Sequence, residues 1–140
     1  LETGASGYAA HRILTEKLKE GRASCLRAKF DEHGMITMEQ ILNAVKEEDD
    51  LAIEVIEKIG TVLGRAIAGL INLFNPETVV IGGTLSEAKE YLMLPIKQSI
   101  QRYSLSIINK DTKIKFSKLG EKAGAIGACM LSRSKLLGLI

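Results

Sequence analysis

The sequence has little net charge, few cysteines and no long uninterrupted apolar run, and each of these features argues against a class of protein. Its 140 residues carry a formal net charge of only +2, which is too small to indicate a nucleic-acid-binding surface. The most apolar stretch, residues 62–74, is interrupted by Arg65 and Asn72, which is typical of a core helix and not of a membrane span. We therefore expect a cytoplasmic protein that makes no membrane contact and whose segment does not itself bind DNA.

Neither the two cysteines nor the acidic run has the pattern of a metal site. Cys25 and Cys129 are far apart and lack metal-type spacing, so we predict that both are reduced and mostly buried. Residues 47–50 are four consecutive carboxylates without the glycine and spacing of a metal loop. We interpret this run as a solvated link that favours the positive end of the following helix.

The chain is one domain's worth of residues, with 46% hydrophobic and 26% charged residues, both ordinary values for a globular protein. Apolar residues recur at helical spacing over residues 5–20, where Ser6 can cap the helix. Thr37 and Gln40 form a capping box that predicts a helix over residues 38–46. The longest predicted helix covers residues 50–74, whereas residues 22–30 fit a short helix and a loop equally well.

Two short strands are predicted. Residues 78–81 are mostly β-branched, the composition of a buried strand, and Gly82 and Gly83 end this strand in a turn that a ligand can approach closely. Residues 113–119 alternate apolar and polar side chains, which is typical of a strand with one face on a core. Because helical segments separate the strands, we expect an α/β fold with parallel pairing.

Three further helical features complete the pattern. Residues 86–92 can form one or two turns, and Pro95 is predicted to begin the next helix, which ends near Tyr103. The small residues from Gly124 to Ala128 open a last helix that runs to about residue 137. Three small residues of the longest helix, at positions 60, 64 and 68, form a groove for another helix, either within the domain or from a second subunit.

Three segments together resemble the end of a known family. Residues 1–7 (LETGASG) match the tail of the signature CxCGxxGCxExxxS, with Glu2 and Ser6 at its last two fixed positions. Residues 64–83 (GRAIAGLINLFNPETVVIGG) and residues 118–132 (KLGEKAGAIGACMLS) follow at the usual spacings. The chain thus resembles the ROK family of repressors, open reading frames and sugar kinases over nearly all of its length.

The resemblance implies an actin-like, ribonuclease-H-like fold of two lobes, with sugar and nucleotide between them. Residues 1–140 would be the last part of the second lobe, so we expect a fragment of a longer protein. The family's first lobe, its sugar-binding Asn-Asp pair with the general-base aspartate, and its zinc-binding cysteines have no counterpart in these residues. Structural zinc is thus expected only in the longer protein, as are ATP and magnesium if that protein is a kinase.

The resemblance also assigns site residues. Glu2 corresponds to a glutamate that accepts hydrogen bonds from hydroxyls of the bound sugar, a role that the lone pairs of a carboxylate suit. Gly82, Gly83 and Thr84 correspond to the turn that approaches the nucleotide, where kinases of the family often carry a third glycine at the position of Thr84. Gly124 lies in a segment near the nucleotide cleft in the family, although tight helix packing would explain its glycines equally well.

The resemblance leaves three functions open. The first is the ligand-sensing part of a sugar-responsive transcriptional regulator of the N-acetylglucosamine or xylose repressor type, which binds DNA through a separate N-terminal domain outside this chain. The second is the C-terminal lobe of an ATP-dependent, glucokinase-like sugar kinase. The third is a dimerisation or interaction module without ligand binding. Family membership implies a homo-oligomer, and this segment alone has no catalytic aspartate and no catalytic or metal-binding residue.

Overall fold

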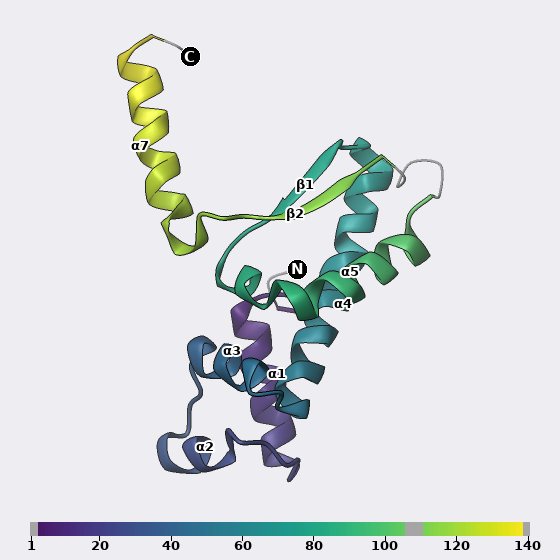
Figure 1. The fold of residues 1–140 in the computed structure, drawn as a ribbon, viewed down its shortest axis with the longest axis vertical. Helices are drawn as coiled ribbons and strands as arrows, with labels where there is room; N and C mark the ends of the chain where they lie inside the picture. The colour runs from purple at the N-terminus through teal and green to yellow at the C-terminus, as the bar shows by residue number, and fades with distance from the viewer. Residues whose placement is uncertain (1–2, 106–110, 139–140) are drawn as a thin grey trace.

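The computed structural model describes residues 3–105 and 111–138. Figure 1 shows a group of helices at one end, the longest helices beside a small sheet, and a final helix that stands apart. In chain order the elements are α1 (Gly7–Lys19), α2 (Arg27–His33), α3 (Met38–Lys46), α4 (Asp50–Phe74), β1 (Thr78–Ile81), the 3-10 helix η1 (Thr84–Ala88), α5 (Lys89–Tyr103), β2 (Lys113–Phe116), η2 (Gly120–Lys122) and α7 (Ala123–Leu136).

Side-chain caps fix the starts of the helices that the sequence predicts. The Ser6 hydroxyl accepts a hydrogen bond from the Ala9 N–H at 3.2 Å and begins α1. Thr37 and Gln40 form the predicted reciprocal capping box at α3, with bonds of 3.2 and 2.8 Å. These side chains accept hydrogen bonds from first-turn N–H groups that have no partner within the helix. The predicted boundaries of both helices are confirmed to within two residues.

The α4–α5 contact forms the centre of the core, and it occupies the small-residue groove. A Cβ atom added at Gly64 would lie 2.7 Å from the Ile96 carbonyl oxygen and from the Ser99 Cβ. At Gly60 the same atom would lie 2.8 Å from Cγ of Pro95. The groove therefore packs a helix of the same chain, which confirms the intramolecular alternative and leaves this face covered.

Pro95 lies inside α5 instead of at its start, so the predicted boundary there is wrong. Proline has no N–H, and the Tyr91 carbonyl one turn earlier therefore lacks its usual helix partner. The buried ring packs against Gly60 of α4, where there is room for it because glycine has no side chain. Packing against α4 therefore outweighs the preference of proline for the first position of a helix, on which the predicted boundary was based.

The sheet has two parallel strands, as predicted, with Val79 beside Ile114 and Ile81 beside Phe116. These four side chains face the core, whereas Val80 is 62% exposed on the other face. The second strand is shorter than residues 113–119. Ser117 still donates its N–H to the Ile81 carbonyl at 2.7 Å, but β1 ends there in its glycine turn and offers no partner to later residues.

Helix α7 and the two cysteines depart furthest from expectation. No residue of α7 is buried against the described part of the chain, and Figure 1 shows the helix standing away from α4, α5 and the two strands. Both cysteines are exposed, so the prediction that they are buried is wrong: Cys25 lies in the turn before α2, and Cys129 lies on α7. Residues 22–30 begin as this turn and enter α2 only at Arg27. No helix within residues 3–105 and 111–138 is long and apolar enough to cross a membrane.

Candidate ligand-binding site

The turn after β1 is the centre of the candidate site, and its two glycines serve different purposes. Gly83 has φ +85° and ψ 176°, a conformation that is essentially confined to glycine. Ser86 stabilises it, since its hydroxyl and its N–H both donate to the Gly83 carbonyl, at 2.6 and 3.0 Å. A Cβ at Gly82 would make only an ordinary 3.6 Å contact with Ser117. The fold thus requires glycine at position 83, whereas position 82 is exposed and open to a neighbouring group.

A cavity of about 340 Å³ joins this turn to the start of the chain. It is lined by residues 5–7, by Met38 at the start of α3, and by residues 82–85. The structure therefore brings two of the three family-like segments together, with Gly82, Gly83 and Thr84 on one wall. The Ser6 hydroxyl on the other wall caps α1. Glu2, the predicted sugar ligand, lies outside the described residues.

A second cavity, also of about 340 Å³ and also lined by Thr84, lies between α3 and η1. We call it the α3–η1 groove, and its lining is mostly polar: Glu39, Leu42, Asn43, Lys46, Thr84 and Glu87. Sequence reasoning missed it. Residues 39, 43 and 46 have the spacing of an ordinary solvated helix face, and no local signal shows that η1 packs on α3.

The Asp49 carboxylate joins the turn before α2 to the start of α4. It accepts hydrogen bonds from the Ser24 hydroxyl at 3.1 Å, the Cys25 N–H at 2.7 Å and the Ala52 N–H at 2.9 Å. Partial burial alone would raise the pKa of Asp49, but these hydrogen bonds outweigh it and leave the pKa below its ordinary value. The acidic run is thus not only a solvated link, because one member is a half-buried cap.

An ion-pair cluster fixes α1 against α4. Glu54 accepts from Lys17 at 2.8 Å and from Arg22 at 2.9 Å. The hydrogen bond from Lys17 is the main reason that the pKa of Glu54 is lowered. Since α1 begins in the first cavity, this cluster contributes to holding that cavity's wall at a fixed distance from α4.

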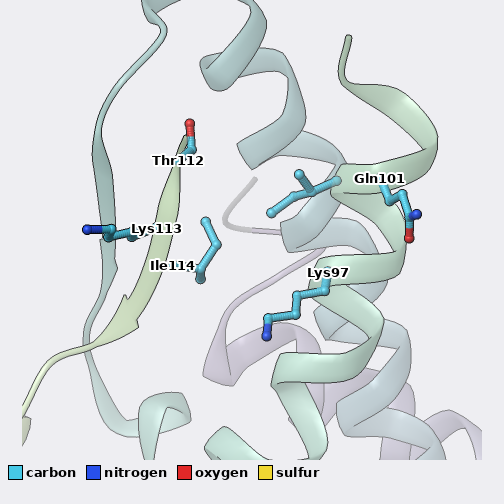
Figure 2. Close-up of a pocket in the computed structure, with 6 residues that line it drawn as sticks. Lys97, Gln101, Thr112, Lys113 and Ile114 are labelled. Carbon is cyan, nitrogen blue, oxygen red and sulfur yellow. The ribbon is translucent and has the colours of Figure 1, made fainter. Parts of the chain in front are cut away.

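A third cavity, of about 450 Å³, lies between α5 and β2 and is not part of the candidate site. Figure 2 shows Lys97 and Ile114 pointing into the space between helix and strand, while Lys113 and Gln101 point away from it. The Thr112 hydroxyl donates to the Pro76 carbonyl at 2.8 Å. None of the predicted site residues lines this cavity, and Lys97 is the charged side chain that points into it.

The glycines of α7 take no part in either cavity beside Thr84. A Cβ at Gly124 or Gly127 would have no neighbour within 4 Å among the described residues. Tight packing, offered above as one explanation for these glycines, is therefore not seen within the part of the chain that the structure describes.

Comparison with known proteins gives one family and two kinds of relative. The ROK family model matches residues 1–135. A glucokinase of Halalkalibacterium halodurans is 38% identical over 135 residues, which are 96% of this chain and 41% of that protein. The DNA-binding transcriptional dual regulator NagC of Escherichia coli K12 is 36% identical over 141 aligned positions, covering all of this chain and 33% of the regulator.

Solved structures show the same two kinds. A ROK family glucokinase from Streptomyces griseus, in complex with glucose and AMPPNP, superposes with a TM-score of 0.81 at 28% identity, over 95% of this chain and 44% of the kinase. A ROK family transcriptional regulator, a homologue of the E. coli MLC protein, gives 0.75 at 39% identity over 82% of this chain and 28% of the regulator.

The extent of these matches settles the family and the fold. This chain spans about a third to two fifths of the length of the curated relatives it matches. Its helix-rich arrangement around two parallel strands is a partial lobe of the actin-like ATPase fold that these sugar kinases and repressors share. With the family model covering all but the last five residues, this chain belongs to the ROK family.

Proposed function

We propose that this chain is the C-terminal, ligand-sensing part of a ROK-type sugar-responsive transcriptional regulator. A protein of the relatives' length that contains it would bind DNA through a separate N-terminal domain. Sugar held between the two lobes would shift the equilibrium between two placements of those domains. The regulator homologous to MLC, at 39% identity, supports this proposal.

Thr84 is the observation that carries the proposal. It occupies the position where kinases of the family often carry a third glycine, and its half-buried side chain lies on the wall shared by the first cavity and the α3–η1 groove. A side chain at this point narrows the space beside Gly82 and Gly83. The two glycines still allow a nucleotide to approach the turn closely. The Thr84 side chain makes the turn less suited to phosphoryl transfer than a third glycine would be.

Glu2 is the proposed sugar ligand, because a carboxylate can accept hydrogen bonds from two neighbouring hydroxyls of one ring. The cavity that joins residues 5–7 to the glycine turn supports this assignment, since it begins three residues after Glu2. Sugar and any nucleotide would then bind at adjoining positions. No zinc, magnesium or catalytic role is proposed for residues of this chain.

A sugar kinase is the alternative, and the 38% identity to a glucokinase is the observation that favours it. Such an enzyme aligns a sugar hydroxyl with the terminal phosphate of ATP and magnesium, and an aspartate takes the hydroxyl proton. That aspartate would belong to a preceding part of the protein. The homo-oligomer that the family implies is compatible with either function.

Calorimetry on a protein of the relatives' length that contains this chain separates the two functions. Hexoses and N-acetylhexosamines are titrated with and without ATP and magnesium, and product is assayed. We expect heat of sugar binding and no phosphorylated sugar; appearance of phosphorylated sugar would refute the regulator. Glu2→Ala should weaken sugar binding by about tenfold or more, the usual contribution of hydrogen bonds to a charged group. Glu20→Ala, at the exposed end of α1, is the matched control, and equal affinities of the two variants would remove Glu2 from the site.

A further inference from the structure

We propose that the open edge of β2, together with the cavity between β2 and α5, binds an extended acidic segment of a partner protein. The segment adds to the sheet as a further strand. This surface is independent of the proposed function, because neither Glu2 nor the glycine turn lines the cavity. Charge, an unpaired strand edge and the cavity beside it all point to the same kind of partner.

The basic residues are concentrated in the C-terminal part of the chain. Residues 91–140 contain nine lysines and arginines and two acids, whereas residues 1–90 contain ten and fifteen. Lys113 and Lys115 of β2 are exposed on the outer face of the sheet. Within the part of the chain that the structure describes, no ion pair joins Lys97, Lys113 or Lys115 to a carboxylate. The surface around β2 is therefore complementary to an acidic partner.

The edge of β2 that faces away from β1 has backbone groups with no partner among the described residues. The sheet there has two strands, so β1 covers one edge of β2 and leaves the other open. Lys113 and Ser117 donate their N–H groups to β1 at 2.9 and 2.7 Å. Alternate residues direct these groups to opposite edges, so Ile114 and Phe116 present theirs at the open edge. Such an edge is a template for another strand.

The cavity of about 450 Å³ lies beside this edge and gives an added strand somewhere to place its side chains. Figure 2 shows β2 as one wall and α5 as the opposite wall, with the Lys97 side chain pointing into the space between them. Ile100 and Ile114 supply apolar lining. An extended peptide that pairs with a sheet edge uses its backbone for affinity and such a pocket for specificity.

The two faces of the sheet set the sequence pattern of the partner. Side chains of a strand alternate between its faces, and those of neighbouring strands lie about 4.5–5.5 Å apart. On the outer face they meet Lys113 and Lys115, which favour glutamate or aspartate. On the inner face they meet Ile114 and the cavity, which favour apolar residues. The partner segment therefore alternates acidic and apolar residues along the four residues of β2.

The test is an NMR titration of the isotope-labelled 140-residue chain with the acetylated peptide EVEVEVEV. We expect the Ile114 and Phe116 amides to shift and to become protected from exchange with solvent. The Lys113 amide, already bonded to the Glu77 carbonyl, should change little. This alternation along β2 is the signature of an added strand, since binding to lysine side chains alone protects no amide.

Two modified peptides show whether the backbone of the partner takes part. One carries N-methyl groups on every valine and the other on every glutamate, so each lacks the N–H donors of one edge of the strand. We expect one of the two to lose binding, the valine form for antiparallel addition and the glutamate form for parallel addition. Binding of both forms as tight as that of the unmodified peptide would overturn the proposal.

Charge variants test the complementarity. Lys113→Gln and Lys115→Gln should each weaken binding by up to about fivefold, the contribution of an opposite-charge pair across two strands. The matched control, Lys19→Gln with Lys29→Gln, removes the same charge from exposed positions of α1 and α2. Equal losses in the two pairs of variants would overturn the assigned surface. So would binding of EEEEVVVV, single-stranded poly-dT or phosphatidylserine vesicles as tight as that of EVEVEVEV, since these carry negative charge without the alternating pattern.

Discussion

The contact between α4 and α5 can be tested by adding a single methyl group. Gly64 and Gly69 lie in the same helix, but the first faces α5 and the second is exposed with nothing within 4 Å of an added Cβ. Replacing glycine by alanine inside a helix stabilises it by about 0.5–1 kcal/mol when the methyl group meets nothing. Gly69→Ala should therefore raise the free energy of unfolding by about that amount.

At Gly64 the same methyl group meets atoms that cannot turn aside. It would lie 2.7 Å from the Ile96 carbonyl oxygen and 2.9 Å from the Ile96 Cα, both in the backbone of α5. Ordinary contacts between carbon atoms are about 3.5–4.0 Å, so the helices must separate by close to 1 Å. Overpacking of this kind costs about 1–3 kcal/mol. After the helix-propensity gain is subtracted, we expect Gly64→Ala to be up to about 2.5 kcal/mol less stable than the unaltered chain.

Urea unfolding of the two variants measures the difference directly. The overpacking cost of about 1–3 kcal/mol should separate Gly64→Ala from Gly69→Ala, with the midpoint changed and the slope unchanged. The comparison removes helix propensity, which is common to both. Equal midpoints would show that α5 does not lie against Gly64 as closely as described, and the position of the glycine turn, which η1 joins to the start of α5, would need revision.

Two further predictions concern Asp49 and the turn. Asp49→Ala should cost about 0.5–2 kcal/mol through loss of the α4 cap, whereas Asp50→Ala should cost less. Folding lowers the pKa of Asp49, so the contribution of its carboxylate to the free energy of unfolding is complete above the ordinary aspartate pKa of about 3.9. That contribution is lost as the pH falls from there through the folded pKa. A pH series of unfolding midpoints in which Asp49→Ala loses stability as steeply as the unaltered chain would contradict this. Gly83→Ala should destabilise the chain by about 1–3 kcal/mol because of its φ of +85°, while Gly82→Ala should be tolerated; thermal melts that rank them the other way would refute the assigned turn.

The predictions that held depend on signals a few residues apart. The Thr37 and Gln40 pair placed α3 correctly because both partners of a capping box lie in one turn. The bounds of α4 followed from its apolar periodicity, and in the structure Asn75 ends the helix in the left-handed conformation before Pro76. The glycine turn was recognisable for the same reason, since strand, glycines and η1 are consecutive.

The predictions that failed depend on residues far apart in the sequence. Pro95 lies within a helix because Gly60, 35 positions earlier, makes room for its ring. Cys129 was expected to be buried because free cysteine is a mostly buried residue type, but no residue of α7 is buried against the described part of the chain. The polar face of α3 became a candidate site only when η1 was seen to pack beside it. The spacing of polar residues within α3 does not indicate that η1 packs beside it.

The isolation of α7 has a consequence for its local stability. A helix of 14 residues with two glycines is marginal in water, and most helices owe their persistence to packing. In the described part of the chain α7 has almost none, so its amide hydrogens should exchange with solvent far faster than those of α4. Slow exchange along α7 would then be a sensitive sign that another surface has engaged its exposed apolar side chains, among them Met130, Leu131 and Leu136.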